Sequence, residues 1–255
     1  MMIELINIEK SFGAHRVLNG ASLKIKKGET KVIIGRSGCG KSVLLKHIVG
    51  ILKPNNGEVL VGGTNVARLG AKELNQVRKK IGMVFQGGAL FDSLNVAENV
   101  GFSYFEHTKM SRDEIIKKVE DSLSLVELYG IGALMPSELS GGMKKRVSLA
   151  RAICSRPEII LYDEPTTGVD PITAAAINEL IKNLHDKLQV TSIVVTHDMT
   201  SAYYVADSIA MLYQGKIIAE GTPTEIQNTD HPVVKQFITG AAEGPITEST
   251  DTDYP

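Results

Sequence analysis

The chain of 255 residues contains no tryptophan, only two cysteines, and 5% aromatic residues. Cys39 and Cys154 lie far apart in the sequence, so they favour neither a disulfide framework nor a zinc site and are typical of a reducing cytosol. No apolar run reaches the ~18 residues that a membrane-spanning helix needs. The first residues also lack the basic and then apolar layout of a secretion signal. These absences predict a cytoplasmic protein without a membrane span of its own.

An excess of positive charge is also missing. The chain has 28 Lys and Arg residues against 29 Asp and Glu residues, which gives a formal net charge of −1. Domains that bind nucleic acid through its phosphates usually carry a basic surplus, so we expect no nucleic-acid partner. Hydrophobic residues make up 43% of the chain, which suffices for a large core. The length therefore predicts one large domain, or one domain with a small insertion.

The most informative stretch is Gly35-Arg36-Ser37-Gly38-Cys39-Gly40-Lys41-Ser42, which fits the P-loop pattern G-x-x-x-x-G-K-[ST]. A β-branched run over 30–34 predicts the strand before it, and apolar spacing over 43–49 predicts the helix after it. Glycines let backbone N–H groups turn toward phosphate oxygens, and the helix start adds the positive end of its dipole. Lys41 would then reach the β- and γ-phosphates of a nucleotide, and Ser42 would hold Mg²⁺.

A second motif is the apolar run over 159–162 followed by Asp163 and Glu164. The run predicts a buried strand, and ligands of open α/β sheets bind at the carboxyl ends of the strands. Asp163 suits the binding of Mg²⁺, directly or through water. Glu164 would be placed to orient and deprotonate an attacking water molecule.

A third motif, Leu139-Ser140-Gly141-Gly142-Met143, precedes a long amphipathic stretch that predicts a helix. It forms a second place where free N–H groups and a helix dipole would face an anion. One ATP molecule has no obvious need for two phosphate cradles in the same chain. We therefore interpret this motif as binding the nucleotide that another copy of the chain holds.

The remaining pattern predicts the fold class. Alternating residues over 2–9 and 17–26 indicate a small antiparallel sheet, and strands that alternate with helices toward residue 219 indicate an α/β fold with a parallel sheet. Residues 87–157 are mainly helical and indicate an inserted subdomain. Residues 241–255 hold four acidic and no basic residues, which predicts a mobile acidic C-terminal tail, either inert or docked on a partner chain.

These motifs, in this order, resemble the ATP-binding cassette (ABC) family over about residues 3–240. The resemblance implies a P-loop NTPase (RecA-like) core with an N-terminal antiparallel β subdomain and an α-helical ABC subdomain at about 87–157. The core and the two subdomains together would form an ABC-type ATP-binding domain over residues 1–240. It also implies a head-to-tail homodimer with two ATP molecules at the interface, each clamped between one chain's P-loop and its partner's signature.

The resemblance further implies a role for individual residues. Catalysis would involve Lys41, Gln86, Glu164 and His197, and Mg²⁺ would be held by Ser42, Gln86 and Asp163. ATP would contact the stretch Gly35, Arg36, Ser37, Gly38, Cys39, Gly40, Lys41, Ser42 and Val43. Phe12 would stack on adenine, with a core position as the alternative. ATP held by the partner would contact Ser140, Gly141, Gly142, Met143 and Asp170.

Two of these motifs depart from the common family pattern. Met143 stands where many members have Gln, and Thr167-Gly168-Val169-Asp170 replaces the commoner Ser-Ala-Leu-Asp. Neither change removes a backbone group that would contact phosphate, so we expect activity to survive.

The signature, the stretch over 87–94 and the ending over 231–238 are together similar to the Mla/Mce-type, Mkl-like lipid-transport ATPases. This resemblance implies an ATPase subunit that is peripheral on the inner membrane and powers phospholipid transport through an integral membrane permease. A small regulatory subunit and a lipid-binding MCE-type protein are further expected partners. Five aromatic residues gather in one stretch: Phe85, Phe91, Phe102, Tyr104 and Phe105. Some of them, together with Leu94, would line a groove for the permease, and the others would pack inside the helical subdomain.

Two other functions remain open at this point. One is the ATPase subunit of an ABC importer for a small polar solute. The other is a soluble ABC regulator that acts on DNA or ribosomes, although such proteins usually carry two cassettes or a long coiled-coil insertion. A GTPase is disfavoured, because the chain has no Asn-Lys-x-Asp stretch to read guanine.

Overall fold

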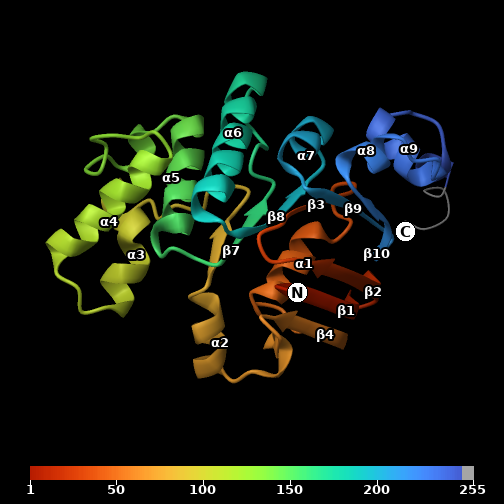
Figure 1. The fold of residues 1–255 in the computed structure, drawn as a ribbon, viewed down its shortest axis with the longest axis horizontal. Helices are drawn as coiled ribbons and strands as arrows, with labels where there is room; N and C mark the ends of the chain where they lie inside the picture. The colour runs from red at the N-terminus through yellow and green to blue at the C-terminus, as the bar shows by residue number, and fades with distance from the viewer. Residues whose placement is uncertain (249–255) are drawn as a thin grey trace.

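The computed structural model describes residues 1–248 and contains two β-sheets with helices packed around them (Figure 1). The smaller sheet is antiparallel and has the strand order β2-β1-β4-β5. Its strands are β1 (Ile3–Phe12), β2 (His15–Ile25), β4 (Asn56–Val61) and β5 (Thr64–Asn65). The antiparallel sheet expected near the N-terminus is therefore confirmed.

The larger sheet has the strand order β10-β9-β3-β8-β7-β6, and five of its six strands run parallel. Its strands are β3 (Thr30–Ile34), β6 (Ile81–Val84), β7 (Ile159–Asp163), β8 (Thr191–Thr196), β9 (Ser208–Tyr213) and the antiparallel edge strand β10 (Lys216–Gly221). β3, β7 and β8 consist mainly of β-branched and aliphatic residues because both faces of this sheet are covered.

Two hydrophobic cores lie on opposite faces of the larger sheet. On β3, Val32 and Ile34 belong to one core, whereas Ile33 between them belongs to the other, as the period of a strand requires. One core includes the small sheet, α1 (Lys41–Ile48) and α2 (Ala71–Arg78). The other core includes the remaining long helices, among them α6 (Pro171–Leu188). Figure 1 shows these layers on either side of β7, β8 and β3.

The expected helical insertion is present between β6 and β7. It contains α3 (Val96–His107), α4 (Arg112–Leu125), a short 3-10 turn η2 (Pro136–Glu138) and α5 (Gly141–Cys154). α3, α4 and α5 pack against one another and stand apart from the small sheet in Figure 1. Ser111 and Glu114 form a capping box at the start of α4, which ends at Leu125.

The C-terminal part adds helices that the sequence pattern does not predict. They are α8 (Pro223–Gln227), α9 (Pro232–Thr239) and α10 (Pro245–Glu248), and they follow α7 (Met199–Val205) and the last two strands. In the N-terminal part, a short 3-10 turn, η1 (Val66–Arg68), follows β5. Residues 241–248, which belong to the segment expected to be mobile, turn back onto α9, and the mobility itself stays a prediction. Ile246 is buried there, and its N–H donates to Gln236 Oε1 at 2.7 Å. Residues 249–255 lie outside the described residues. Within residues 1–248, no helix combines the length and the apolar character that crossing a membrane requires.

The edge strand β10 is fixed by a buried charge. Lys31 on β3 is only 2% exposed, and its ammonium group contacts Glu29 at 3.0 Å and also Glu220 of β10. Ser208 donates a hydrogen bond to the same Glu29 carboxylate. The interactions join the start of β3 to β9 and β10 at the edge opposite the carboxyl ends of the parallel strands.

Candidate functional site

The predicted nucleotide site forms where four neighbouring strands end. β3, β8, β7 and β6 are parallel neighbours, so their carboxyl ends lie along one edge of the sheet. The P-loop follows β3, and His197 follows β8. Asp163 ends β7 with Glu164 directly after it, and Gln86 follows β6. A cleft of about 240 Å³ lies at this edge, lined by Ser37, Gly38, Gly40, Lys41, Ser42, Val43, Gln86, Glu164 and His197. Residues from four separate sequence motifs therefore meet in one cleft.

The path of the P-loop depends on its glycines. Gly35 has φ +153°, and a Cβ placed there would lie 2.4 Å from the carbonyl oxygen of Leu212. Gly40 has φ +105° and caps the start of α1, where a Cβ would lie 3.0 Å from Val17 Cγ1. Only glycine fits such positions without strain, so the loop can place its N–H groups at the base of the cleft. The other loop residues follow from this path: Cys39 is half-buried, and Arg36 is exposed.

Lys41 and Ser42 are held by contacts inside the chain. Lys41 is 5% exposed, and its Nζ donates to the carbonyl oxygens of Gly35 at 2.8 Å and Arg36 at 3.0 Å. Ser42 Oγ donates to Asp163 Oδ1 at 2.7 Å. Burial raises the pKa of Asp163, although the hydrogen bond from Ser42 acts in the opposite direction. A hydroxyl and a carboxylate in contact, with the Gln86 amide lining the same cleft, are the oxygen ligands that suit Mg²⁺.

Glu164 is the most closely held acidic group of the cleft. It is 7% exposed, its Oε1 lies 3.4 Å from Lys41 Nζ, and its Oε2 lies 2.8 Å from His197 Nδ1. Thr167 Oγ1 donates a further hydrogen bond to Oε2 at 3.1 Å. The backbone of Glu164 is left-handed, with φ 49°, and its N–H donates to the carbonyl of Val195. Such strain in a non-glycine residue persists only where the surroundings enforce it, which is common at functional sites.

Sequence reasoning missed the contribution of Thr167. It placed this residue only as a departure from the common D-loop pattern, whereas the hydroxyl supports the Glu164 carboxylate directly. The spacing of three residues between a carboxylate and a hydroxyl in a turn is a signal that could have indicated this contact.

The signature residues lie outside the cleft. Ser140 caps α5, and its Oγ accepts a hydrogen bond from Met143 N at 3.2 Å. Gly141 is exposed, and a Cβ there would meet nothing within 4 Å, whereas a Cβ at Gly142 would touch Thr173 of α6. None of these residues lines the cleft beside Lys41. Their predicted contact with the ATP of another copy stays a prediction.

Two other predicted residues also stand apart from the cleft. Asp170 caps α6, because its Oδ1 accepts from the N–H groups of Ile172 and Thr173 at 3.0 Å each. Phe12 ends β1, and its ring is 46% exposed with Lys10 Nζ 5.4 Å from the ring centre. An exposed ring is not the core aromatic that was the alternative for this residue, and such a ring is accessible for stacking on a base. The stacking itself stays a prediction.

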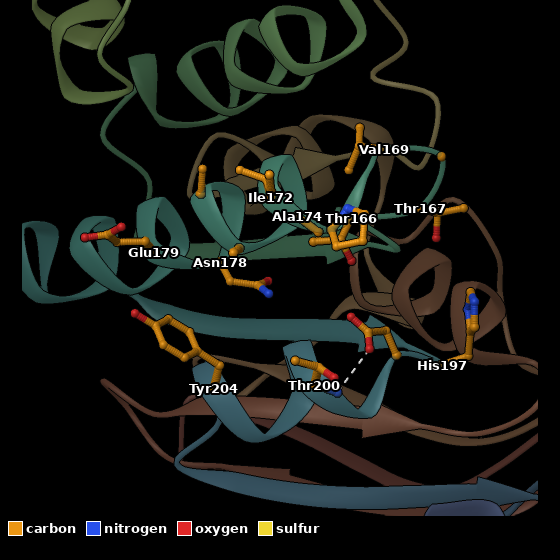
Figure 2. A pocket seen from close by; sticks show the side chains of 15 residues that line it. Thr166, Thr167, Val169, Ile172, Ala174, Asn178, Glu179, His197, Thr200 and Tyr204 are labelled. Carbon is orange, nitrogen blue, oxygen red and sulfur yellow. Dashed lines mark hydrogen bonds between the residues drawn. The ribbon is translucent and has the colours of Figure 1, made fainter. Parts of the chain in front are cut away.

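A larger cavity of about 820 Å³ lies beside His197, between the start of α6 and α7 (Figure 2). Ile172 and Val169 lie on one side of it and Thr200 and Tyr204 on the other, with His197 at one end. Asn178 is buried in its wall, and its Nδ2 donates to Ser201 Oγ at 2.8 Å. Sequence reasoning did not predict this cavity, because the residues that line it come from segments that only the fold brings together.

Comparison with known proteins identifies the family. Residues 18–167 match the family described as ABC transporter. The chain belongs to this family. The intermembrane phospholipid transport system ATP-binding protein MlaF of Haemophilus influenzae is 43% identical, over 96% of this chain and 93% of its own length. A protein of Mycobacterium leprae named "Probable ribonucleotide transport ATP-binding protein mkl" is 41% identical, over 98% of this chain and 72% of its own length.

Solved structures support the same conclusion about the fold. A dimeric ATP-binding cassette in a post-hydrolysis state, bound to ADP and Pi, superposes with a TM-score of 0.80 at 35% identity, over 87% of this chain and 99% of that chain. The expected fold class, an ABC cassette on a P-loop core, is therefore confirmed. As a member of this family, the chain binds ATP and is an ATPase. Cassettes of this family dimerise and work with membrane permeases.

Proposed function

We propose that this chain is the ATPase subunit of a phospholipid transporter and acts through a partner membrane permease at the inner membrane. One observation carries this proposal. The MlaF protein of Haemophilus influenzae, whose name assigns it to an intermembrane phospholipid transport system, is similar over 96% of this chain and nearly its own full length. The small regulatory subunit and the lipid-binding MCE-type partner remain predictions that accompany this assignment.

The nucleotide would bind with its phosphates on the P-loop. The N–H groups of residues 37–42 and the start of α1 would face the phosphate oxygens. Lys41 Nζ now contacts two loop carbonyl groups and would exchange part of this interaction for the β- and γ-phosphates. Ser42, Asp163 and Gln86 would hold Mg²⁺, which neutralises charge on the phosphates when it is bound.

Hydrolysis would depend on Glu164. Its carboxylate lies between Lys41 and His197, at the edge of the cleft where the γ-phosphate would end. Glu164 would accept a proton from the attacking water or orient it, while His197 holds the carboxylate from the other side. Gln86 lines the same cleft and would contact the γ-phosphate together with His197.

We infer that the working unit is a head-to-tail homodimer. The N-terminus of α5 is exposed, and among the described residues the signature does not line the cleft that contains the P-loop. Placing the signature of one copy, Ser140 to Met143, over the P-loop of another would complete both sites.

The permease would dock on the helical insertion. Phe91 is 45% exposed and stacks on Phe102 with ring centres 4.7 Å apart. A cleft of about 630 Å³ lies between the start of α3 and the end of α4, and the exposed Tyr129 stands at its rim. Exposed aromatic rings such as Phe91 and Tyr129 are typical of interfaces, and Tyr129 also lines the cleft. Leu94, expected to be exposed there, is half-buried, and Tyr104 and Phe105 pack toward the core.

The docking surface can be tested with Phe91→Glu. A carboxylate in place of this ring should weaken copurification of the permease by at least about tenfold, because it would be buried in an apolar contact. The ATPase activity of the isolated subunit should persist, since the ring does not line the nucleotide cleft. Tyr204→Glu, the same kind of change on α7, serves as the control and should leave copurification unchanged. Unchanged copurification of Phe91→Glu would place the docking surface elsewhere.

A second candidate function is the transport of a ribonucleotide, because the similar protein of Mycobacterium leprae bears that name. The two are separated by purifying the chain with its permease and placing the complex in vesicles. Phospholipid transport predicts copurifying lipid and ATP-dependent transfer of labelled phospholipid. Transfer of a labelled ribonucleotide, with no movement of phospholipid, would replace the proposal by the second candidate.

A further inference from the structure

The loop after β6 is tied to the signature helix by a row of hydrogen bonds. Lys145 Nζ donates to the backbone carbonyl of Gln86 at 2.5 Å, and Ser148 Oγ donates to that of Gly88 at 3.1 Å. Arg151 donates from Nη2 to Gly88 at 2.8 Å and from Nη1 to Ala89 at 2.7 Å. The three donors lie three residues apart on α5, so they share one face of that helix. Each acceptor is a carbonyl group of the loop rather than a side chain.

Lys145 is the unusual member of this row. It is 8% exposed, and within residues 1–248 it forms no ion pair with a carboxylate. A buried ammonium group without an ion-pair partner costs free energy, so a neutral donor would be the cheaper choice for a purely structural contact. Burial lowers the pKa of Lys145, and the attraction of Glu164 acts in the opposite direction.

The loop conformation also requires an external hold. Gly88 and Ala89 are both left-handed, with φ 76° and 46°, and alanine pays a cost for this conformation. Arg151 binds the Ala89 carbonyl and so supports the strained residue. Farther along, the buried Asn99 of α3 accepts from Phe91 N at 2.8 Å and donates to the carbonyls of Phe91 and Leu94. Both halves of the loop are thus held by helices of the insertion.

The joint between the two parts of the molecule follows from these contacts. The backbone up to Val84 belongs to the parallel sheet through β6. From the carbonyl of Gln86 onward, the backbone is bonded to α5 and α3. The chain passes from the sheet to the helices of the insertion at Phe85 and Gln86. Lys145 makes the first contact on the side of the insertion.

We propose that Lys145 is a positioning residue for Gln86. The hydrogen bond from its buried ammonium group attaches the backbone of Gln86 to α5, the helix that begins at the signature, rather than to the sheet. Lys145 thereby fixes where Gln86 lies relative to Lys41 and Ser42 in the nucleotide cleft. This inference rests on the proposed role of Gln86.

The first test is kinetic and compares Lys145→Met with Lys145→Arg. Methionine fills a similar volume but cannot donate, so kcat for ATP should fall at least about tenfold while KM stays within about twofold. Arginine can still reach the carbonyl and should restore most of kcat. Lys117→Gln removes a positive charge from an exposed site on α4 and should match the wild type. The melting temperature of Lys145→Met should not drop, because a buried unpaired charge is removed.

The second test reports the position of the loop directly. The chain has no tryptophan, so Phe85→Trp introduces a single tryptophan next to Gln86. In a Glu164→Gln background, ATP should shift its emission, and the shift should be lost with Lys145→Met and kept with Lys145→Arg. If Lys145→Met proves unstable, Lys145→Leu, which also cannot donate, replaces it in both tests.

A kcat for the Met variant within twofold of the wild type, or an unchanged emission shift, would overturn the inference. The two proposals fail separately. ATP hydrolysis and loop fluorescence of the purified chain measure the role of Lys145, whereas loss of the phospholipid assignment would appear only as missing lipid transfer by the wild-type complex.

Discussion

Two helices of this chain begin after a glycine-containing motif, and their first turns differ. α1 starts at Lys41 behind Gly40, which is buried, left-handed and provides no side-chain cap. Asp163, Glu164 and His197 surround this start, so the chain itself builds the site around the free N–H groups. α5 starts at the exposed Gly141 and is capped only by the hydroxyl of Ser140.

The difference indicates a division of labour between the two helix ends. The start of α1 carries cations, carboxylates and a histidine in contact, so it can bind and position a nucleotide within one chain. The first turn of α5 offers N–H groups and a dipole but has no acidic side chain. Changes at α1 should therefore affect binding and chemistry, whereas changes at α5 should affect only steps that need a second copy.

The largest effect is expected at the α1 site, from Glu164→Gln. The amide keeps the size of the side chain but cannot accept a proton from water, so phosphate release should fall at least about 1000-fold. ATP binding should persist, and the loaded chain should elute as a dimer in size-exclusion chromatography with ATP and Mg²⁺. Turnover at the normal rate would show that Glu164 is not the base or the water-orienting group.

A smaller effect should follow from Gly141→Asp at the start of α5. A carboxylate at this helix end would repel the phosphates of the partner's ATP, so kcat should drop about 100-fold. The affinity of the isolated chain for ATP, measured by calorimetry, should stay within about twofold. Asn183→Asp adds the same carboxylate to the exposed surface of α6 and should behave as wild type. A full-rate Gly141→Asp enzyme that remains monomeric would remove the basis for the shared site.

A pair of alanine substitutions compares the two ends without adding charge. Gly40→Ala would bring a methyl group within 3.0 Å of Val17 at φ +105°, so the P-loop should distort and ATP affinity should fall about tenfold. Gly141→Ala meets nothing within 4 Å and should leave the affinity of the isolated chain for ATP unchanged. Calorimetric titration of both variants is the measurement, and equal losses of affinity would contradict the division.

The smallest effect concerns the body of α1. His47 is fully buried, its Nδ1–H donates to the Val43 carbonyl at 2.7 Å, and its Nε2 has no partner within residues 1–248. Burial lowers its pKa below 6.5, so at acidic pH the unfolded chain binds a proton that the folded chain does not. The free energy of unfolding should therefore fall as pH drops below about 6.5. Urea titrations near pH 7.5 and 5.5 should show a smaller fall for His47→Leu than for the wild type.

Much of the nucleotide site could be predicted from the sequence, because each motif sits at the end of a predicted strand. The P-loop, the pair Asp163 and Glu164, and His197 follow three of these strands, and parallel strands deliver their carboxyl ends to one edge. The order of the motifs then selected the family. Membership of the ABC family was confirmed by the matched residues 18–167.

The contacts that refine the site could not be predicted in this way. Lys145 and Gln86 are 59 residues apart, and the sequence pattern marks Lys145 only as one of several basic residues on a helix. The helices after β10 were missed because α8 and α10 are short and their helical periodicity covers about one turn each. Leu94 was expected to be exposed, but the side chain of Asn99 draws its backbone toward α3 and leaves it half-buried.

The buried Lys31, which contacts the edge strand β10 of the larger sheet, has a consequence for self-association. An edge strand normally offers unpaired backbone groups to which a strand of another molecule can add. Along β10, Lys31 holds the charged side chain of Glu220 in place. Because charged side chains on an edge strand disfavour the addition of another strand, this ion pair helps to protect the edge of the larger sheet from strand addition.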